Sequence, residues 1–379
     1  MLNICSIIGT RPEAIKMAPV AIAAQQRSGI RHRFVATGQH GALFDQAIDG
    51  FGLSVDQHLG IRPARGDLTV QVDAMRAAIS AMLATNRPDI VLVQGDTNSA
   101  YAAALAAHDR GIQIGHVEAG LRTHIPERPW PEERNRCAIG QIAKLHFAPS
   151  RIAMTNLGRE RVPGLAVLTG NTGIDALLMT MRPFAKANGS VRNIIVTCHR
   201  HENFGAPLAN ICHALRRIAQ REDVRITFPL HPNSQVRDVV ETALGRLDGI
   251  TLTEPLDYHE MVAAIRTAHI VISDSGGLQE ECVVLGIPLI LMRDETERPE
   301  VIASRNCVLV GSNADAIVRE TSRLLDDSGH HAEMSRPSFP YGDGKAAHRI
   351  LDVITYLGSG SVENHGLMPR IPRRNNEVV

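Results

Sequence analysis

Residues 269–281 read HIVISDSGGLQEE, and this stretch decides the fold. The β-branched run predicts a strand, the small residues at 274–277 predict a tight turn, and LQEE predicts the start of a helix. Two glycines let the backbone approach a ligand closely, and a helix N-terminus attracts anions. The stretch is therefore typical of a diphosphate site, although such a turn can also cap an ordinary helix. Its candidate ligands are Ser275, Gly276, Gly277 and, for sugar hydroxyls, Glu281.

A second strand, turn and helix open the chain. The apolar run at 2–8 is followed by GTRPEAIKMAPV at 9–20, and Pro12 stands where a helix can begin without losing a hydrogen bond. Arg11 and Lys16 lie at this helix start and are candidate cations for phosphate groups. Because the two turns are far apart in the chain, we expect two units that face one nucleotide across a cleft.

Apolar runs alternate with helical patterns along most of the chain. This alternation predicts an α/β fold, with parallel sheets covered by helices on both faces. Glycine and proline between 170 and 192 indicate a hinge, and residues 358–379 have the composition of a frayed tail. We therefore expect one α/β domain over 1–170 and a second over 171–357. The predicted strands are 2–8, 34–37, 90–94, 112–117, 145–148, 194–197, 224–229, 250–253, 269–273, 288–292 and 307–310.

Composition excludes several classes of function. The chain has 40 Lys+Arg and 40 Asp+Glu, and this zero net charge argues against nucleic-acid or anionic-membrane partners. Its six cysteines lack metal-ligand spacing, so we expect reduced thiols, a cytoplasmic location and no metal site. The short first apolar run predicts a strand rather than a signal peptide, and no run is long enough to span a membrane. Without a Gly-x-Gly-x-x-Gly fingerprint, we expect no dinucleotide cofactor.

Three carboxylates are candidates for proton transfer. Asp96 and Glu118 follow two predicted strands, and ligands bind at the carboxyl ends of parallel strands. Glu132 follows Pro131 at a predicted helix start, with Glu133 as a neighbour expected to matter less. The alternatives are an N-cap for Asp96 and favourable interaction with the helix dipole for the glutamates. Clustered carboxylates raise at least one pKa, which suits proton transfer.

Further candidates follow strands of the second half. His199 lies in VTCHRHEN and His231 in PLHPN, and both are candidates for the nucleotide side of a site. A histidine at a strand end is also often structural. Arg293 and the charged run at 294–300 are expected to form a rim of the cleft, with a solvated surface loop as the alternative.

Ten segments together resemble the non-hydrolysing UDP-N-acetylglucosamine 2-epimerase family. They occur in the order of that family and cover residues 1 to about 355, which makes the set far more specific than any one member. The segments are GTRPEAIKMAPV (9–20), TGQH (37–40), VQGDT (93–97), GHVEAGLRT (115–123), WPEERNR (130–136), TGNT (169–172), CHRHENFG (198–205), SDSGG (273–277), RDETERPE (293–300) and YGDGKA (341–346).

The resemblance implies a glycosyltransferase-B type fold, in which two Rossmann-like domains face a central cleft and the C-terminal segment, 358–379, joins the first domain. It implies elimination of UDP to 2-acetamidoglucal and re-addition, which interconverts UDP-N-acetylglucosamine and UDP-N-acetylmannosamine for surface polysaccharides. It implies no cofactor, a UDP-sugar substrate and a homodimer. The implied catalytic residues are Asp96, Glu118, Glu132 and His199, and the implied UDP or substrate ligands are Arg11, Lys16, Arg136, His231, Ser275, Gly276, Gly277, Glu281 and Arg293.

Members regulated by their own substrate have a second site, for which Gln39, His40 and Arg200 are the possible ligands here. His201 and Gly41 depart from that pattern and argue against such activation. The alternatives to the implied reaction are hydrolysis to N-acetylmannosamine and UDP, epimerisation of a related UDP-2-acetamido sugar, glycosyl transfer, or binding of a sugar nucleotide without catalysis.

Overall fold

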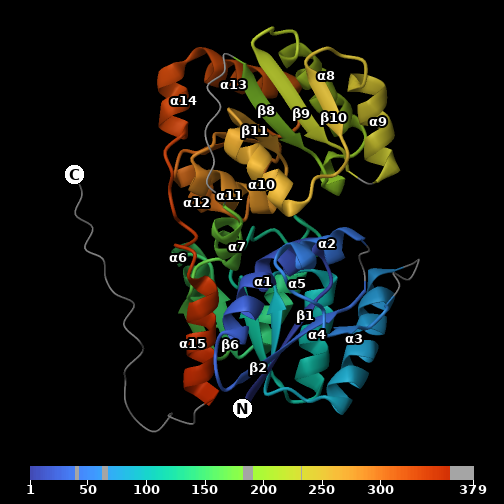
Figure 1. Cartoon of the computed structure of the whole chain (residues 1–379), viewed down its shortest axis with the longest axis vertical. Coiled ribbons are helices and arrows are strands. Elements are labelled where there is room, and N and C mark those ends of the chain that lie inside the picture. The colour runs from blue at the N-terminus through green and yellow to red at the C-terminus, as the bar shows by residue number, and fades with distance from the viewer. Residues whose placement is uncertain (39–41, 62–66, 182–190, 232, 359–379) are drawn as a thin grey trace, which may run out of the picture.

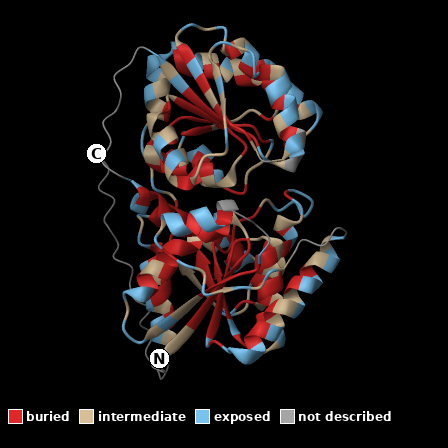
Figure 2. Ribbon diagram, turned by 45° about the vertical axis from the view of Figure 1, so that its right-hand side comes forward, coloured by how far each residue is buried: buried red, intermediate tan, exposed pale blue. Residues whose placement is uncertain are grey.

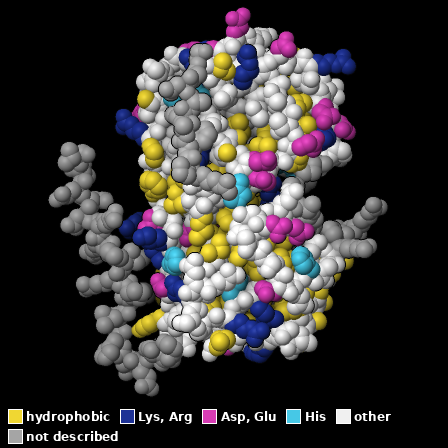
Figure 3. Space-filling model, in the orientation of Figure 1, with side chains coloured by type: hydrophobic (Ala, Val, Ile, Leu, Met, Phe, Trp, Pro, Cys, Tyr) yellow, Lys and Arg dark blue, Asp and Glu magenta, His cyan; other side chains and the backbone are white. Residues whose placement is uncertain are grey.

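The computed structural model describes residues 1–38, 42–61, 67–181, 191–231 and 233–358, which form two α/β lobes stacked along the long axis (Figure 1). We call them the N-terminal and the C-terminal lobe. The predicted α/β class and the glycosyltransferase-B arrangement are confirmed. No helix of the described residues is long and apolar enough to cross a bilayer. On the face in Figure 3, basic and acidic side chains are interspersed, in keeping with the zero net charge.

The N-terminal lobe contains a seven-stranded parallel sheet with the order β3-β2-β1-β4-β5-β6-β7. Alternate residues of β1 face opposite sides, so that Ile4 and Ile8 join one core and Cys5 and Ile7 the other. The strands are β1 (Leu2–Ile8), β2 (Ile30–Ala36), β3 (Gln57–His58), β4 (Ile90–Gln94), β5 (Gln113–Val117), β6 (Leu145–Ala148) and β7 (Leu165–Leu168). The helices are α1 (Arg11–Gln25), α2 (Ala42–Gly50), α3 (Leu68–Thr85), α4 (Asn98–Asp109), α5 (Glu132–Ile142) and α6 (Arg151–Arg159). Helix α7 (Thr172–Thr180) lies between the two lobes, because it packs against α1 while its Ile174 and Leu177 join a core of the C-terminal lobe.

The C-terminal lobe contains a six-stranded parallel sheet with the order β10-β9-β8-β11-β12-β13. The strands are β8 (Arg192–Thr197), β9 (Val224–Pro229), β10 (Ile250–Thr253), β11 (Ile270–Ser273), β12 (Leu289–Leu291) and β13 (Cys307–Leu309). The helices are α8 (Ala206–Ile218), α9 (Ser234–Leu244), α10 (Tyr258–Thr267), α11 (Gly276–Leu285), α12 (Pro299–Ala303), α13 (Ala314–Asp326) and α14 (Ser328–Met334), with a short 3-10 helix, η1 (His201–Asn203).

Both sheets lie between helices, and their inner strands are mostly red in Figure 2. This burial explains why the strands read as apolar runs rather than as alternating patterns. The six cysteines are free thiols, and five of them are buried.

The last described helix, α15 (Ala346–Gly358), lies beside the N-terminal lobe (Figure 1). Its Ile350 and Leu351 pack into the same core as α1. Asp175 of α7 accepts hydrogen bonds from the first two backbone N–H groups of α15, at 3.1 and 2.8 Å. The chain therefore returns through residues just ahead of the segment 358–379, of which only Gly358 lies within the described residues.

Candidate active site

The ends of strands from both sheets meet where the lobes touch, and Glu118 lies at this junction. Its Oε2 accepts a hydrogen bond from Lys16 Nζ at 2.5 Å and another from Gln94 Nε2. Its Oε1 accepts one from Arg298 Nη2 of the C-terminal lobe at 2.8 Å. Burial raises the pKa of the Glu118 carboxyl, and the cations of Lys16 and Arg298 oppose that shift. One buried carboxylate is thus shared between cations of both lobes.

The backbone of Glu118 is itself unusual. Its φ is 65°, in the left-handed region that non-glycine residues seldom adopt. Strained backbone of this kind is concentrated at functional sites, where the surrounding structure holds it. In this backbone conformation, the Glu118 side chain at the end of β5 lies between Lys16 and Arg298.

Asp96 follows β4 and is held by an ion pair. Arg136 Nη2 of α5 donates to Asp96 Oδ2, and Asn135 Nδ2 donates to the Asp96 carbonyl at 2.9 Å. The alternative that Asp96 caps α4 is wrong, because Thr97 is the N-cap and accepts from Ala100 N at 3.0 Å. The structure therefore brings Asp96 and Arg136, both predicted site residues, into direct contact.

Glu132 differs from Asp96 and Glu118 in its surroundings. Within the described residues, Glu132 Oε2 is buried without a hydrogen-bond partner. Burial raises the pKa of this carboxyl, and the neighbouring Asp96 charge adds to the increase. A raised pKa suits a carboxyl that has to carry a proton during a reaction.

The neighbouring Glu133 has a definite structural role. It is buried, accepts hydrogen bonds from Thr123 N at 3.1 Å and His124 N at 3.0 Å, and lies 3.2 Å from Arg136 Nη1. Replacing it would therefore disturb the loop before α5. It is a poor reference for the effect of replacing Glu132.

The turn at 273–277 begins α11 as predicted, with Ser275 as N-cap. A β-carbon at Gly277 would have open space, whereas one at Gly276 would lie 3.0 Å from Arg298 Nη1. The turn therefore leaves room for a ligand at Gly277 and has a guanidinium beside Gly276. Both features suit an anion.

Two charged residues of α11 lie deeper in the same junction. Glu280 accepts from Arg298 Nε at 2.6 Å and Asn171 Nδ2 at 2.8 Å, and lies 3.9 Å from Lys16 Nζ. Glu281 accepts from Tyr258 Oη at 3.1 Å. Burial raises the pKa of Glu281 to about 7, against the opposing effect of the Tyr258 hydrogen bond.

His199 is oriented by a buried carboxylate. Its Nδ1 donates to Asp274 Oδ1 at 2.9 Å, and Asp274 also accepts from His199 N, Arg200 N and Asn203 Nδ2. Although burial alone would raise the pKa of Asp274, the charge of His199 and these hydrogen bonds hold it well below its usual range. The ring of His231 stacks on that of His199, with centroids 6.4 Å apart.

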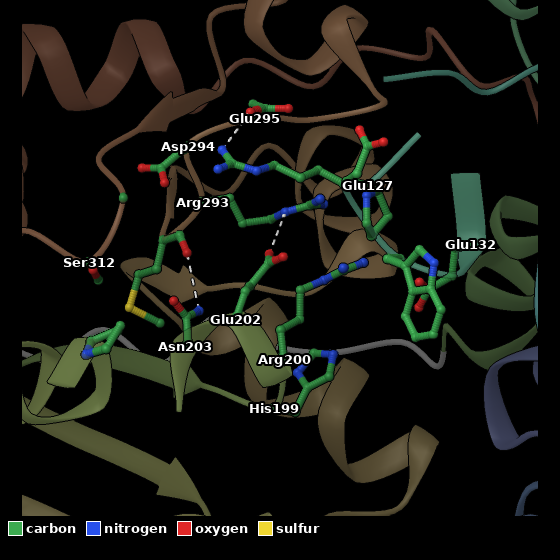
Figure 4. Close-up of a pocket in the computed structure, with 16 residues that line it drawn as sticks. Glu127, Glu132, His199, Arg200, Glu202, Asn203, Arg293, Asp294, Glu295 and Ser312 are labelled. Atoms are coloured by element: carbon green, nitrogen blue, oxygen red, sulfur yellow. Dashed lines mark hydrogen bonds and ion pairs between the residues drawn. The ribbon is translucent and has the colours of Figure 1, made fainter. Parts of the chain in front are cut away.

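A cavity of about 670 Å³ opens beside these groups, between the two lobes. Figure 4 shows Glu132 on one side of it and His199, Arg200 and Arg293 on the other. Arg293 is buried and lies 3.0 Å from Glu297 and 3.4 Å from Glu202, so the alternative of a solvated loop is wrong for this residue. The cavity gathers four of the predicted site residues.

The remaining predicted residues are placed as follows. Arg11 Nη2 donates to the Leu256 carbonyl of the C-terminal lobe at 2.8 Å, at the same junction as Lys16. Gln39 and His40 lie outside the described residues, so only Arg200 of that predicted group has a position. No group of three or more described His, Cys, Asp or Glu side chains is arranged to hold a metal ion.

Several residues of this junction were not predicted as individual site residues. Glu297 and Arg298 belong to the charged run that was expected at the rim of the cleft, and Asp274, Gln94 and Asn171 lie inside quoted segments. Their segments were the only signal that could have found them, because their contacts join distant parts of the chain.

Comparison with known proteins agrees with this architecture. A crystal structure of the glycotransferase of kitacinnamycin is 13% identical, covers 93% of this chain and 98% of its own, and has a TM-score of 0.62; this likeness concerns the fold alone. The fold and the junction define an α/β protein of the glycosyltransferase-B type.

Closer matches identify the family. A family model described as UDP-N-acetylglucosamine 2-epimerase matches residues 22–355. A putative UDP-N-acetylglucosamine 2-epimerase of Clostridium acetobutylicum is 41% identical over 366 residues, which are 94% of this chain and 95% of the relative. The Neisseria meningitidis UDP-GlcNAc 2-epimerase, solved bound to UDP-GlcNAc, is 35% identical and covers 93% of this chain and 100% of its own, with a TM-score of 0.89. The chain belongs to the UDP-N-acetylglucosamine 2-epimerase family.

Proposed function

We propose that the protein interconverts UDP-N-acetylglucosamine and UDP-N-acetylmannosamine without net hydrolysis. The observation that carries this proposal is the convergence of Asp96, Glu118 and Glu132 on a junction that also holds Lys16 and Arg298. Proton transfer to and from carbon 2 needs carboxylates, and a departing diphosphate needs cations. The bound UDP-GlcNAc of the Neisseria relative supports this choice of substrate.

The reaction proceeds by elimination and re-addition. A carboxylate takes the proton from carbon 2 while the bond from carbon 1 to the UDP oxygen breaks, which leaves a carbon 1–carbon 2 double bond in 2-acetamidoglucal. UDP then adds back to carbon 1, and a carboxylic acid delivers a proton to the opposite face of carbon 2. Glu132, which has a raised pKa and no partner among the described residues for one oxygen, is suited to carry that proton.

Binding of UDP would use groups from both lobes. Arg11 and Lys16 approach from α1, while His199, His231 and the turn at 275–277 approach from the C-terminal sheet. Arg136 acts by holding the Asp96 carboxylate. Arg293 acts by holding the carboxylates of Glu202 and Glu297. Glu281 is placed to accept hydrogen bonds from ribose hydroxyls.

Burial of the junction favours re-addition over hydrolysis. Glu118, Arg298 and Glu280 are each less than one-tenth exposed, so water has little access to an intermediate held between them. Exclusion of water protects reactive intermediates from side reactions.

We further infer that the enzyme is a homodimer. Light scattering of the purified protein tests this inference. We also infer that its product feeds surface polysaccharide synthesis.

Product analysis in heavy water tests the reaction. With UDP-N-acetylglucosamine alone, the purified protein should form UDP-N-acetylmannosamine carrying one solvent deuterium at carbon 2, and treatment with EDTA should not change the rate. Mass spectrometry and proton NMR measure the deuterium content of the product and the rate of its formation. Release of free N-acetylmannosamine and UDP would instead establish hydrolysis, and epimerised product with only protium at carbon 2 would exclude the elimination.

Glu281 should make UDP binding depend on pH. With a pKa of about 7 it is mostly protonated at pH 6 in the free protein, and hydroxyl groups that donate to it favour the ionised form. Binding of UDP therefore releases a proton, and affinity rises as the pH increases from 6 to 8. Calorimetry in buffers of different ionisation enthalpy measures this release. Glu281→Gln should release fewer protons than the wild type, because only protons from the UDP phosphate and other groups remain; equal release would remove Glu281 from the site.

A further inference from the structure

Glu13 is a fully buried carboxylate that the proposed reaction does not use. It lies in α1 between Arg11 and Lys16. Its Oε2 accepts hydrogen bonds from Gly9 N at 3.0 Å and Thr10 N at 2.6 Å, both in the turn that follows β1. Alone, these bonds would make a capping box at the start of α1, together with the bond that Glu13 N donates to Thr10 Oγ1.

Glu13 also reaches a second turn. Thr97 Oγ1 donates to Glu13 Oε1 at 2.8 Å, and Ser99 Oγ donates to Oε2 at 3.1 Å. Thr97 ends the turn after β4 and directly follows Asp96, and Ser99 lies in the first turn of α4; both are more than 80 residues further along the chain. A helix cap requires none of these long-range contacts.

The packing around Gly9 makes the connection tight. A β-carbon at Gly9 would lie 2.3 Å from Ser99 Oγ and 2.7 Å from Thr37 Oγ1. The turns after β1 and β2 and the first turn of α4 therefore pack closely around Gly9, whose N–H bonds the Glu13 carboxylate, with no room for another group at Gly9. A shift of one turn has to be transmitted to the others.

We propose that Glu13 is a positioning residue that fixes the turn carrying Arg11 relative to the turn carrying Asp96. In the reaction proposed above, on which this inference rests, Arg11 meets the diphosphate and Asp96 acts at the sugar. Glu13 touches neither. It sets the distance between the group that holds the leaving UDP and the group that acts at carbon 2, and small errors in such distances are costly to the rate.

Two pairs of variants test this role. Thr97→Val removes the hydroxyl and with it the hydrogen bond between Glu13 and the residue next to Asp96, while Thr97→Ser keeps that bond. Glu13→Asp is too short to reach both turns, while Glu13→Gln can still accept from Gly9 and Thr10 and donate to the hydroxyls. We expect Thr97→Val to lower kcat about 10-fold or more with little change in UDP affinity. Glu13→Asp should lower both kcat and UDP affinity. Thr97→Ser and Glu13→Gln should retain most of the activity.

Asn313→Ala is the matched control for the loss of a helix cap. Asn313 caps α13 in the C-terminal lobe, as Thr97 caps α4, but it is remote from Glu13. Its loss should lower Tm comparably and leave kcat unchanged. All assays are run well below the Tm of each variant, so that only folded protein is compared.

Non-additivity completes the test. Because Glu13→Asp and Thr97→Val break the same connection, the double variant should lose little more kcat than the worse single variant. Single variants that lower only Tm, with kcat and UDP affinity equal to the wild type, would reduce Glu13 to a helix cap and overturn the proposal. If the wild type does not epimerise at all, the proposed function fails. UDP affinity then decides the role of Glu13, since only the Glu13→Asp variant should bind UDP more weakly.

Discussion

Glu118→Gln is expected to lower kcat by about 10²–10⁴-fold, the usual contribution of a general acid–base group. The amide keeps the size of the side chain and its positive-φ backbone, but it cannot exchange a proton with carbon 2. It also places a neutral group between Lys16 and Arg298. Because the residues proposed to bind UDP are others, UDP affinity should change much less than kcat. Steady-state kinetics and UDP calorimetry measure the two quantities.

The control for Glu118→Gln is Glu222→Gln. Glu222 is exposed and does not line the cavity, so its replacement should leave kcat within about twofold of the wild type, since surface substitutions usually change stability little. Since the loss of one partner from a buried ion pair typically costs about 3–5 kcal/mol of stability, Tm is measured for each variant. A folded Glu118→Gln protein with near-normal kcat would remove Glu118 from the catalytic set.

Gly277→Val is expected to reduce UDP affinity by about 100-fold or more while the protein still folds, since a blocked diphosphate forfeits several charge-assisted hydrogen bonds. A β-carbon at Gly277 meets no atom within 4 Å, so the valine fits the free protein but enters the space left for the ligand. Gly276→Val is less informative, because its β-carbon would lie 3.0 Å from Arg298. Calorimetry with UDP measures the loss.

Gly158→Val provides the matched control. Gly158 also lies in a helix, α6, and its β-carbon would likewise meet nothing within 4 Å, but the residue is exposed and away from the junction. The same substitution there should leave UDP affinity unchanged. Normal UDP affinity in the Gly277→Val protein would mean that the diphosphate does not occupy this turn.

Most strands could be predicted because a buried parallel strand is a continuous apolar run. Five predicted ranges coincide with the observed strands, namely those of β1, β4, β6, β9 and β10. Strands β3 and β7 were not predicted. The first has two residues, and the four residues of the second are only half buried at the edge of the sheet, so neither leaves a strong apolar signal.

The positions of the candidate carboxylates could be predicted, but their partners could not. Asp96 and Glu118 follow strands, and a parallel sheet collects strand ends at one edge. By contrast, Lys16 and Arg298 are 102 and 180 residues away from Glu118, and no local pattern reports such pairs. Local reasoning also could not separate Asp96 from Thr97 as the cap of α4, because both residue types cap helices well.

The ion pair between Glu118 and Arg298 makes the acid–base state of one side chain depend on the separation of two lobes. Arg298 lowers the proton affinity of Glu118, so opening the cleft, which withdraws Arg298, raises that affinity. By thermodynamic reciprocity, a proton that arrives on Glu118 weakens the attraction that draws the lobes together. In the proposed reaction, proton transfer at carbon 2 and opening of the cleft are therefore coupled through the free energy of this one ion pair.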